Sequence, residues 1–210
     1  MIHKLNTNHQ KIFTLRALDH ALGILWAFSF HKYLESYFNK AAFSRSQCCD
    51  LYSLYSIIPV LKKRSESANL DRRIPKETIQ DMKNAGFFKI LQPKQYGGFE
   101  LDPHTFSEVQ LRISQGCMST AWVLGVIGIH PFQLALYDDK AQLEVWGEDD
   151  NTLVSSSYAP MGQVTPVDGG FKFSGHWQWS SGSEHCDWAL LGGLIFPPEG
   201  GVPEYRTFLI

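Results

Sequence analysis

The sequence predicts an α+β fold in which a helical domain is followed by an antiparallel β domain. Helical start and stop signals recur between residues 54 and 150, and after Asn151 short strand-like runs alternate with Gly, Pro and Asp turns. With 210 residues, of which 44% are hydrophobic, the chain is long enough to bury a substantial core. We expect a helical domain at 54–150, a β domain at 151–210, and an atypical N-terminal segment at 1–53.

Start and stop signals mark two helices in the first half of the helical domain. One begins at Pro75 and ends at Gly86, because proline suits a first helical turn and glycine readily adopts the left-handed conformation that ends a helix. The other begins at Pro103, with Asp102 as a capping carboxylate, and runs to Gly116.

A third helix is expected to start at Ser119 or Thr120. It is apolar on all faces, which is typical of a helix in the middle of a bundle. Pro131 is expected to interrupt it directly after His130, because proline lacks the backbone N–H that continues a helix. An amphipathic helix that closes at Gly147 completes the domain.

Short apolar runs in the last 60 or so residues have the composition of strands. The predicted strands are residues 153–158, 170–173, 177–180, 188–191 and 207–210. Asp168, Gly169 and Gly170 predict a tight hairpin turn between the first two.

Composition favours small-molecule chemistry. A net charge of −2 without a basic run argues against nucleic acid or an anionic membrane surface as a partner. The apolar run 21–30 is too short to span a bilayer and has no signal-cleavage site after it, so a cytoplasmic location is expected. Four cysteines without CxxC spacing indicate neither a disulfide framework nor a metal site.

Polar groups interrupt the apolar pattern at His130, at the serines 155–157, and at 177–182, where two hydroxyls follow two tryptophans. Each has an ordinary structural explanation: a helix-end histidine, strand serines bonded to backbone, and core tryptophans. Together they combine the aromatic walls and hydroxyl donors that a flat isoalloxazine ring requires. Serine-hydrolase, phosphate-loop and dinucleotide fingerprints are absent from the sequence.

Several motifs, in order and in register, carry a family resemblance. They are residues 70–78, 86–88, 91–98, 119–123, 155–162 and 175–182. From about Tyr55 onward the chain resembles the acyl-CoA dehydrogenase-like flavin-dependent monooxygenases. The nearest are the oxygenase components of 3-hydroxy-9,10-secoandrosta-1,3,5(10)-triene-9,17-dione 4-hydroxylases, followed by that of 4-hydroxyphenylacetate 3-hydroxylase.

The resemblance implies a fold and a reaction. The fold is an N-terminal helical domain and an incomplete antiparallel β domain of the acyl-CoA dehydrogenase fold, with the C-terminal four-helix bundle absent, so the chain is expected to be a truncated form. The reaction uses reduced FMN from a separate flavin reductase, with FAD as the alternative, and O2 to hydroxylate a phenol ortho to its hydroxyl. The phenol is expected to be a steroid-degradation intermediate, and the full-length family to form homotetramers.

The resemblance also assigns residues. His130 and Ser156 match positions that hydrogen-bond the phenol and favour its phenolate, and the ordinary pKa of an imidazole, about 6.5, suits that role. Ser181 matches the hydroxyl that faces flavin N5, and Trp122 an aromatic wall that excludes water. The remaining residues expected to bind the cofactor are Ser180, Ser157, Tyr158 and Trp179.

Two alternatives remain at this stage. The chain could be a non-catalytic fragment of such an enzyme. It could also be an acyl-CoA dehydrogenase that uses FAD and a carboxylate base, although those enzymes carry Thr-Glu-Pro where this chain has Tyr158, Ala159 and Pro160.

Overall fold

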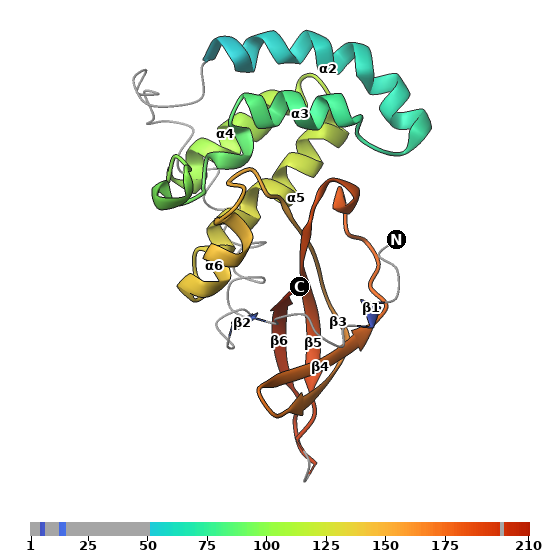
Figure 1. The fold of residues 1–210 in the computed structure, drawn as a ribbon. Coiled ribbons are helices and arrows are strands. Elements are labelled where there is room, and N and C mark those ends of the chain that lie inside the picture. The colour runs from blue at the N-terminus through green and yellow to red at the C-terminus, as the bar shows by residue number, and fades with distance from the viewer. Residues whose placement is uncertain (1–4, 7–12, 16–50, 198–199) are drawn as a thin grey trace.

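The computed structural model describes residues 5–6, 13–15, 51–197 and 200–210, and its helices gather at one end with a sheet at the other (Figure 1). The expectation drawn from the apolar run 21–30 lies outside these residues, as do Cys48 and Cys49. No helix in the described ranges is long and apolar enough to cross a membrane.

Among the described residues there are five α-helices and three short 3-10 helices. The α-helices are α2 (Leu51–Asp71), α3 (Lys76–Asn84), α4 (Pro103–Ser114), α5 (Met118–Leu134) and α6 (Asp139–Trp146). The 3-10 helices are η1 (Phe87–Lys89), η2 (Lys94–Tyr96) and η3 (Ser183–His185). The predicted signals for α3 and α4 are confirmed: Gly86 follows α3 with a φ of 72°, and the Asp102 carboxylate accepts from Thr105 N at 3.0 Å.

Pro131 does not interrupt α5, contrary to prediction. The helix continues to Leu134, and Ala135 N donates to the Pro131 carbonyl at 3.1 Å. The ring removes one backbone donor, but its fixed φ is helical and the last turn is held by the buried Pro131 and Leu134. Nor is α5 buried on all faces, because Met118, Trp122 and Phe132 are exposed along one side.

The strands form one six-stranded sheet in the order β1-β4-β3-β5-β6-β2. Their bounds are β1 Leu5–Asn6, β2 Phe13–Leu15, β3 Val154–Val167, β4 Gly170–Gly175, β5 Trp188–Ile195 and β6 Glu204–Leu209. The predicted hairpin at Gly169 is confirmed between β3 and β4, with a φ of 75° at that glycine. The predicted strand at 177–180 is wrong, because Trp179 has a φ of 62°, which is incompatible with an extended strand.

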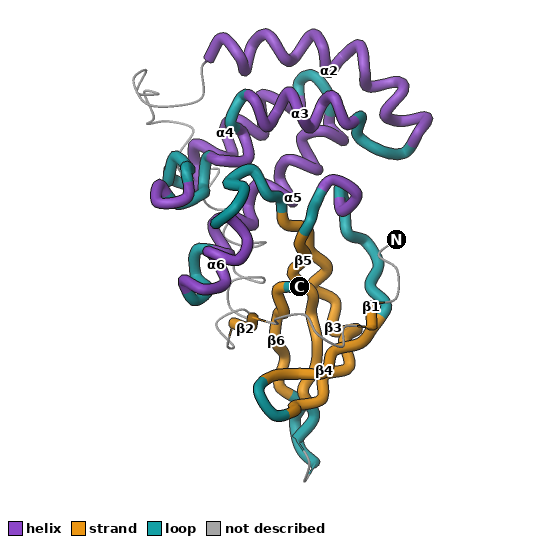
Figure 2. Tube along the Cα trace, in the orientation of Figure 1, coloured by secondary structure: helices purple, strands orange, loops and turns teal. Residues whose placement is uncertain are grey.

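The sheet is mixed rather than antiparallel, because β3 and β5 pair in parallel with Val154 opposite Trp188. The reason is the connection between β4 and β5. Residues 176–187 leave the sheet, run toward α5, and return on the far side of β3, as the loop and η3 in Figure 2 show. A connection of about a dozen residues is long enough to join parallel strands, whereas a hairpin turn is not.

The second half of α5 and α6 cover one face of the sheet. Leu134 and Trp146 pack there against the strand residues Val154, Leu190 and Leu209. This packing holds the C-terminal end of α5, which carries His130, over the start of β3, which carries Ser156 and Tyr158.

Candidate functional site

Helix α5 carries two of the predicted residues, Trp122 and His130. They are separated by eight positions, or about 12 Å along the axis at 1.5 Å per residue. Each contacts a different segment of the β domain, so the helix holds two groups of polar and aromatic side chains a fixed distance apart.

Trp122 meets the loop between β4 and η3. Its indole Nε1 donates to Ser181 Oγ at 3.1 Å. The next residue, Gly182, has a φ of 75°, and a Cβ there would lie 2.8 Å from side-chain carbons of Val123 and Ile127. The loop therefore lies directly on α5, and only glycine allows an approach this close.

Ser180 and Trp179 are the neighbours of this contact. Ser180 Oγ is buried and has no hydrogen-bond partner in the described part of the chain. Trp179 is 92% exposed, and its backbone has a left-handed conformation. The start of α5 and the loop that packs on it thus carry two hydroxyls, those of Ser180 and Ser181, and two accessible indole rings, those of Trp122 and Trp179.

His130 forms the second group. Its side chain is 1% exposed, and its Nδ1 lies 3.3 Å from the hydroxyl of Tyr158. Its Nε2 is buried and has no partner among the described residues. Burial lowers the pKa of His130 to about 3, so the ring is neutral near pH 7. The ordinary imidazole pKa expected from the sequence therefore does not apply.

The side chains of β3 alternate between the two faces of the sheet. Val154 packs against α5 and Tyr158 contacts His130, so Ser156, which lies between them, belongs to the same face. Ser157 belongs to the opposite face, where its hydroxyl donates to the Gln178 carbonyl at 2.8 Å. The structure thus groups Ser156 and Tyr158 with His130, and it separates Ser157 from them.

Two residues that sequence reasoning missed complete the second group. Gln133 Oε1 accepts a short hydrogen bond from the Tyr158 hydroxyl, and Tyr205 on β6 donates to the Tyr158 carbonyl at 2.9 Å. Gln133 follows His130 by three positions on a helix, so its spacing was a usable signal. Tyr205 carried no such signal, because its partner lies on another strand.

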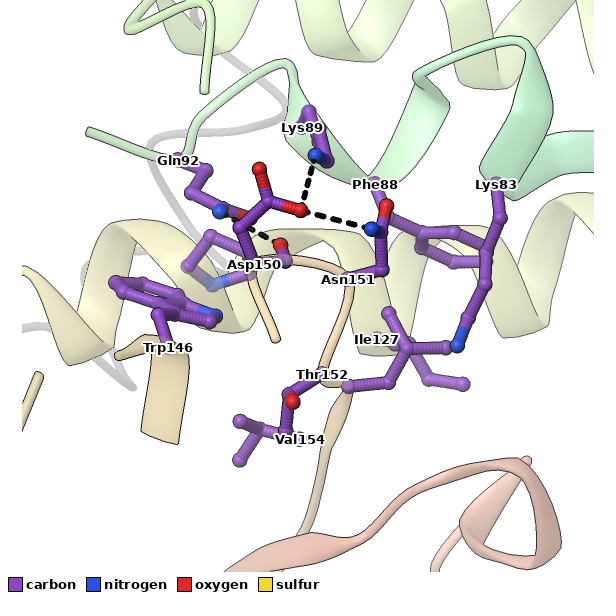
Figure 3. A pocket seen from close by; sticks show the side chains of 12 residues that line it. Lys83, Phe88, Lys89, Gln92, Ile127, Trp146, Asp150, Asn151, Thr152 and Val154 are labelled. Atoms are coloured by element: carbon purple, nitrogen blue, oxygen red, sulfur yellow. Dashed lines mark hydrogen bonds and ion pairs between the residues drawn. The ribbon is translucent and has the colours of Figure 1, made fainter. Parts of the chain in front are cut away.

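A pocket lies between α3, η1, α5, α6 and the start of β3 (Figure 3). Its lining residues are Lys83, Phe88, Lys89, Gln92, Ile127, Pro131, Trp146, Asp150, Asn151, Thr152, Leu153 and Val154. Lys89 Nζ is paired with Asp150 Oδ1 at 2.8 Å. None of the predicted site residues lines this pocket, so it is not the candidate site.

Residues 59–146 match the family described as acyl-CoA dehydrogenase, N-terminal domain. The chain has the acyl-CoA dehydrogenase-like fold and is related to flavin-dependent monooxygenases with that fold, which confirms the resemblance predicted from the motifs.

Two of the curated relatives are the oxygenase components of a flavin-dependent monooxygenase and of a hydroxylase. The flavin-dependent monooxygenase oxygenase subunit HsaA of Mycobacterium tuberculosis is 42% identical over 160 residues, covering 76% of this chain and 40% of the relative. The oxygenase component of p-hydroxyphenylacetate 3-hydroxylase of Acinetobacter baumannii is 35% identical over 71% of this chain and 36% of its own length. The chain thus spans about 40% or less of the length of these relatives.

Solved structures agree with this assignment. The 3-HSA hydroxylase of Rhodococcus sp. RHA1 superimposes with a TM-score of 0.73 at 42% identity, over 76% of this chain and 41% of the other. XiaF from Streptomyces, solved in complex with FADH2, superimposes with a TM-score of 0.70 at 26% identity, over 75% of this chain and 40% of the other.

Proposed function

We propose that the protein is the oxygenase component of a two-component flavin-dependent monooxygenase that hydroxylates a phenol ortho to its hydroxyl. The observation that carries the proposal is the contact between Trp122 and Ser181, beside a buried Ser180 hydroxyl that has no partner within the described ranges. The relatives that are at least 30% identical and act as hydroxylases or monooxygenases support the same class of reaction.

The residues around Ser181 fit a flavin. The Ser181 oxygen accepts from Trp122 with one lone pair, so its second lone pair is available to accept from the N5–H of a reduced flavin, and its own proton is available to another acceptor. Ser180 has a buried hydroxyl that needs a partner, and Trp179 exposes an aromatic face. When bound, the reduced flavin would activate O2 and supply the oxygen atom. We propose reduced FMN as the cofactor and FAD as the alternative.

His130 and Ser156 are proposed to hold the phenol. A neutral imidazole whose Nε2 has no partner among the described residues can accept a hydrogen bond from the phenol O–H, which increases the electron density of the aromatic ring. Because burial disfavours the imidazolium so strongly, we expect His130 to polarise the O–H bond rather than to carry the proton unaided. Ser156 lies on the same face of β3 and is the second hydrogen-bonding group.

The partners follow from the same proposal. A separate flavin reductase would supply the reduced cofactor in the cytoplasm, and the protein would form a homotetramer. Among phenols we propose a steroid-degradation intermediate, because the relatives at 42% identity include HsaA and the 3-HSA hydroxylase.

A two-stage experiment tests this function. First, the purified chain is titrated into anaerobic reduced FMN and, separately, reduced FAD, and the flavin spectrum and fluorescence are recorded. Second, a flavin reductase, NADH, O2 and either the secosteroid phenol or 4-hydroxyphenylacetate are added, and products that are one oxygen atom heavier are sought by mass spectrometry. We expect a perturbed flavin spectrum and a catechol.

Matched variants make the result specific. Ser181→Ala should weaken flavin binding, and Ser156→Ala should reduce catechol formation while flavin binding is kept. Ser114→Ala is the control, because that hydroxyl bonds to the nearby Leu111 carbonyl on α4. If the chain changes the spectrum of neither flavin and no catechol forms, the chain is a non-catalytic relative and the proposal fails.

A further inference from the structure

The Tyr158 hydroxyl lies between two side chains of α5. It donates to Gln133 Oε1, and its oxygen lies 3.3 Å from His130 Nδ1. A phenolic hydroxyl has one proton to give and a lone pair with which to accept. Since that proton is directed to Gln133, the Tyr158 oxygen is the acceptor in its contact with His130, and Nδ1 is the donor.

A neutral imidazole carries its single proton on one nitrogen only. We infer that Tyr158 and Gln133 are positioning residues that fix His130 as its Nδ1–H tautomer and so keep Nε2 as a hydrogen-bond acceptor. Identifying the donor at Nε2 as the phenol O–H rests on the proposed function; the tautomer assignment does not.

The surroundings of Nε2 support this assignment. The nitrogen is buried and has no partner within the described ranges, and an unsatisfied buried polar atom is unfavourable. A site with one unoccupied acceptor is suited to a ligand that brings a donor. The low pKa of His130, about 3, keeps the ring neutral, so the choice between tautomers determines what Nε2 can bind.

The backbone of β3 holds Tyr158 in place for this role. Tyr205 donates to the Tyr158 carbonyl at 2.9 Å, and the pairing of β3 with β5 changes register just after Ser157. Such irregularities re-aim a side chain relative to the regular strand. Opposite, Gly192 lets β5 approach closely, because a Cβ there would lie 2.3 Å from the same carbonyl.

The test reads the tautomer directly. The chain is labelled with ¹⁵N-histidine, and two-dimensional NMR at pH 7.5 correlates ring nitrogens with ring protons; the His130 signals are assigned by their loss in His130→Asn. We expect a protonated Nδ1 and an unprotonated Nε2. Protonation of Nε2 in the parent chain would overturn the inference.

Three variants establish that Tyr158 and Gln133 are responsible. Tyr158→Phe keeps the ring but removes the hydroxyl, and Gln133→Leu removes the acceptor of its proton; both should increase the Nε2–H form at least several-fold. Gln133→Glu keeps an acceptor and should retain the parent tautomer, which a merely structural role for Gln133 does not require. Circular dichroism identifies any variant that fails to fold, and an unchanged tautomer ratio in folded Tyr158→Phe and Gln133→Leu contradicts the inference.

The same spectra separate this inference from the proposed function. No flavin, reductase or phenol is needed to read the tautomer. Adding the secosteroid phenol should then shift the His130 Nε2 resonance in the parent chain. If the tautomer is as expected but no phenol shifts Nε2, the proposed function fails while the positioning role of Tyr158 and Gln133 stands.

Discussion

Trp122 and Ser181 are 59 residues apart in the chain and are joined by a hydrogen bond of 3.1 Å from the indole nitrogen to the hydroxyl oxygen. The Trp122 side chain is 62% exposed, so this bond lies at the surface rather than in the core. It occupies one lone pair of Ser181 and so restricts the orientation of the hydroxyl, whose second lone pair and proton remain for another partner. The contact thus has more to do with the orientation of the serine than with stability.

Trp122→Phe should therefore change flavin affinity more than stability. Losing one exposed hydrogen bond is expected to lower the free energy of unfolding by about 1 kcal/mol or less. Urea denaturation measures the stability, and the reduced-flavin titration measures the affinity. Ser114→Ala is the matched control, because it also removes one exposed hydrogen bond, to the Leu111 carbonyl on α4, at a residue outside the proposed flavin site. A loss of stability well above 1 kcal/mol in Trp122→Phe would contradict a mainly orienting role.

Gly182→Ala should destabilise the chain more than Gly169→Ala. Both glycines have a φ of 75°, but only at Gly182 would a Cβ meet other atoms, Val123 and Ile127, at 2.8 Å. Gly169→Ala thus measures the backbone cost, about 1–2 kcal/mol. Gly182→Ala adds overpacking of about 1–3 kcal/mol. If urea denaturation gives the two variants the same loss in free energy of unfolding, the loop accommodates the added methyl group without overpacking.

Gly192→Ala should disturb the environment of His130 from the opposite strand. Its Cβ would lie 2.3 Å from the Tyr158 carbonyl, whereas a Cβ at Gly170, also in a strand, would meet nothing within 4 Å. We expect Gly192→Ala to cost about 1–3 kcal/mol and to move the His130 ring signals. Gly170→Ala should leave both unchanged or slightly raise stability. Unmoved ring signals in Gly192→Ala would argue that Tyr158 does not depend on this approach.

Stability should fall with acidification because of His130. Its pKa is about 3 in the folded chain and about 6.5 when unfolded, so the unfolded state binds more protons between these values. This contribution is fully present above pH 6.5 and decreases as the pH falls toward 3. From pH 7 to pH 5 it amounts to about 2 kcal/mol, at 1.36 kcal/mol per pH unit below 6.5.

His130→Asn isolates that contribution, since an amide does not titrate in this range. The variant should be less stable than the parent at pH 7, and the difference between the two should narrow toward pH 5 in urea denaturation series. A constant difference would mean that the buried imidazole titrates in the folded state with its ordinary pKa.

Local chemistry made part of this fold predictable. Asp102 caps a helix and Gly169 turns a hairpin through contacts within a few residues, so their sequence signals sufficed. Pro131 was misjudged because burial of the helix end outweighed a local preference. The parallel pairing of β3 with β5 depends on the path of residues 176–187, which no local signal describes.

The candidate site, too, was predictable from the sequence only in part. His130, Ser181, Trp122 and Tyr158 were all found through motifs. Their pairing was not, because the bonds from Tyr158 to His130 and from Trp122 to Ser181 span 28 and 59 positions. The pKa of His130 could not be predicted from the sequence either, because it depends on how completely the fold removes water from the ring.

The buried hydrogen bond between the hydroxyls of Tyr137, just after α5, and Thr207 on β6 joins residues 70 positions apart at 3.0 Å. During synthesis, Tyr137 leaves the ribosome long before Thr207 exists. The apolar surface beneath α5 and α6 must therefore wait for β6, and contacts of such long sequence separation form slowly. In the cell this interval is when the nascent chain most needs protection by chaperones.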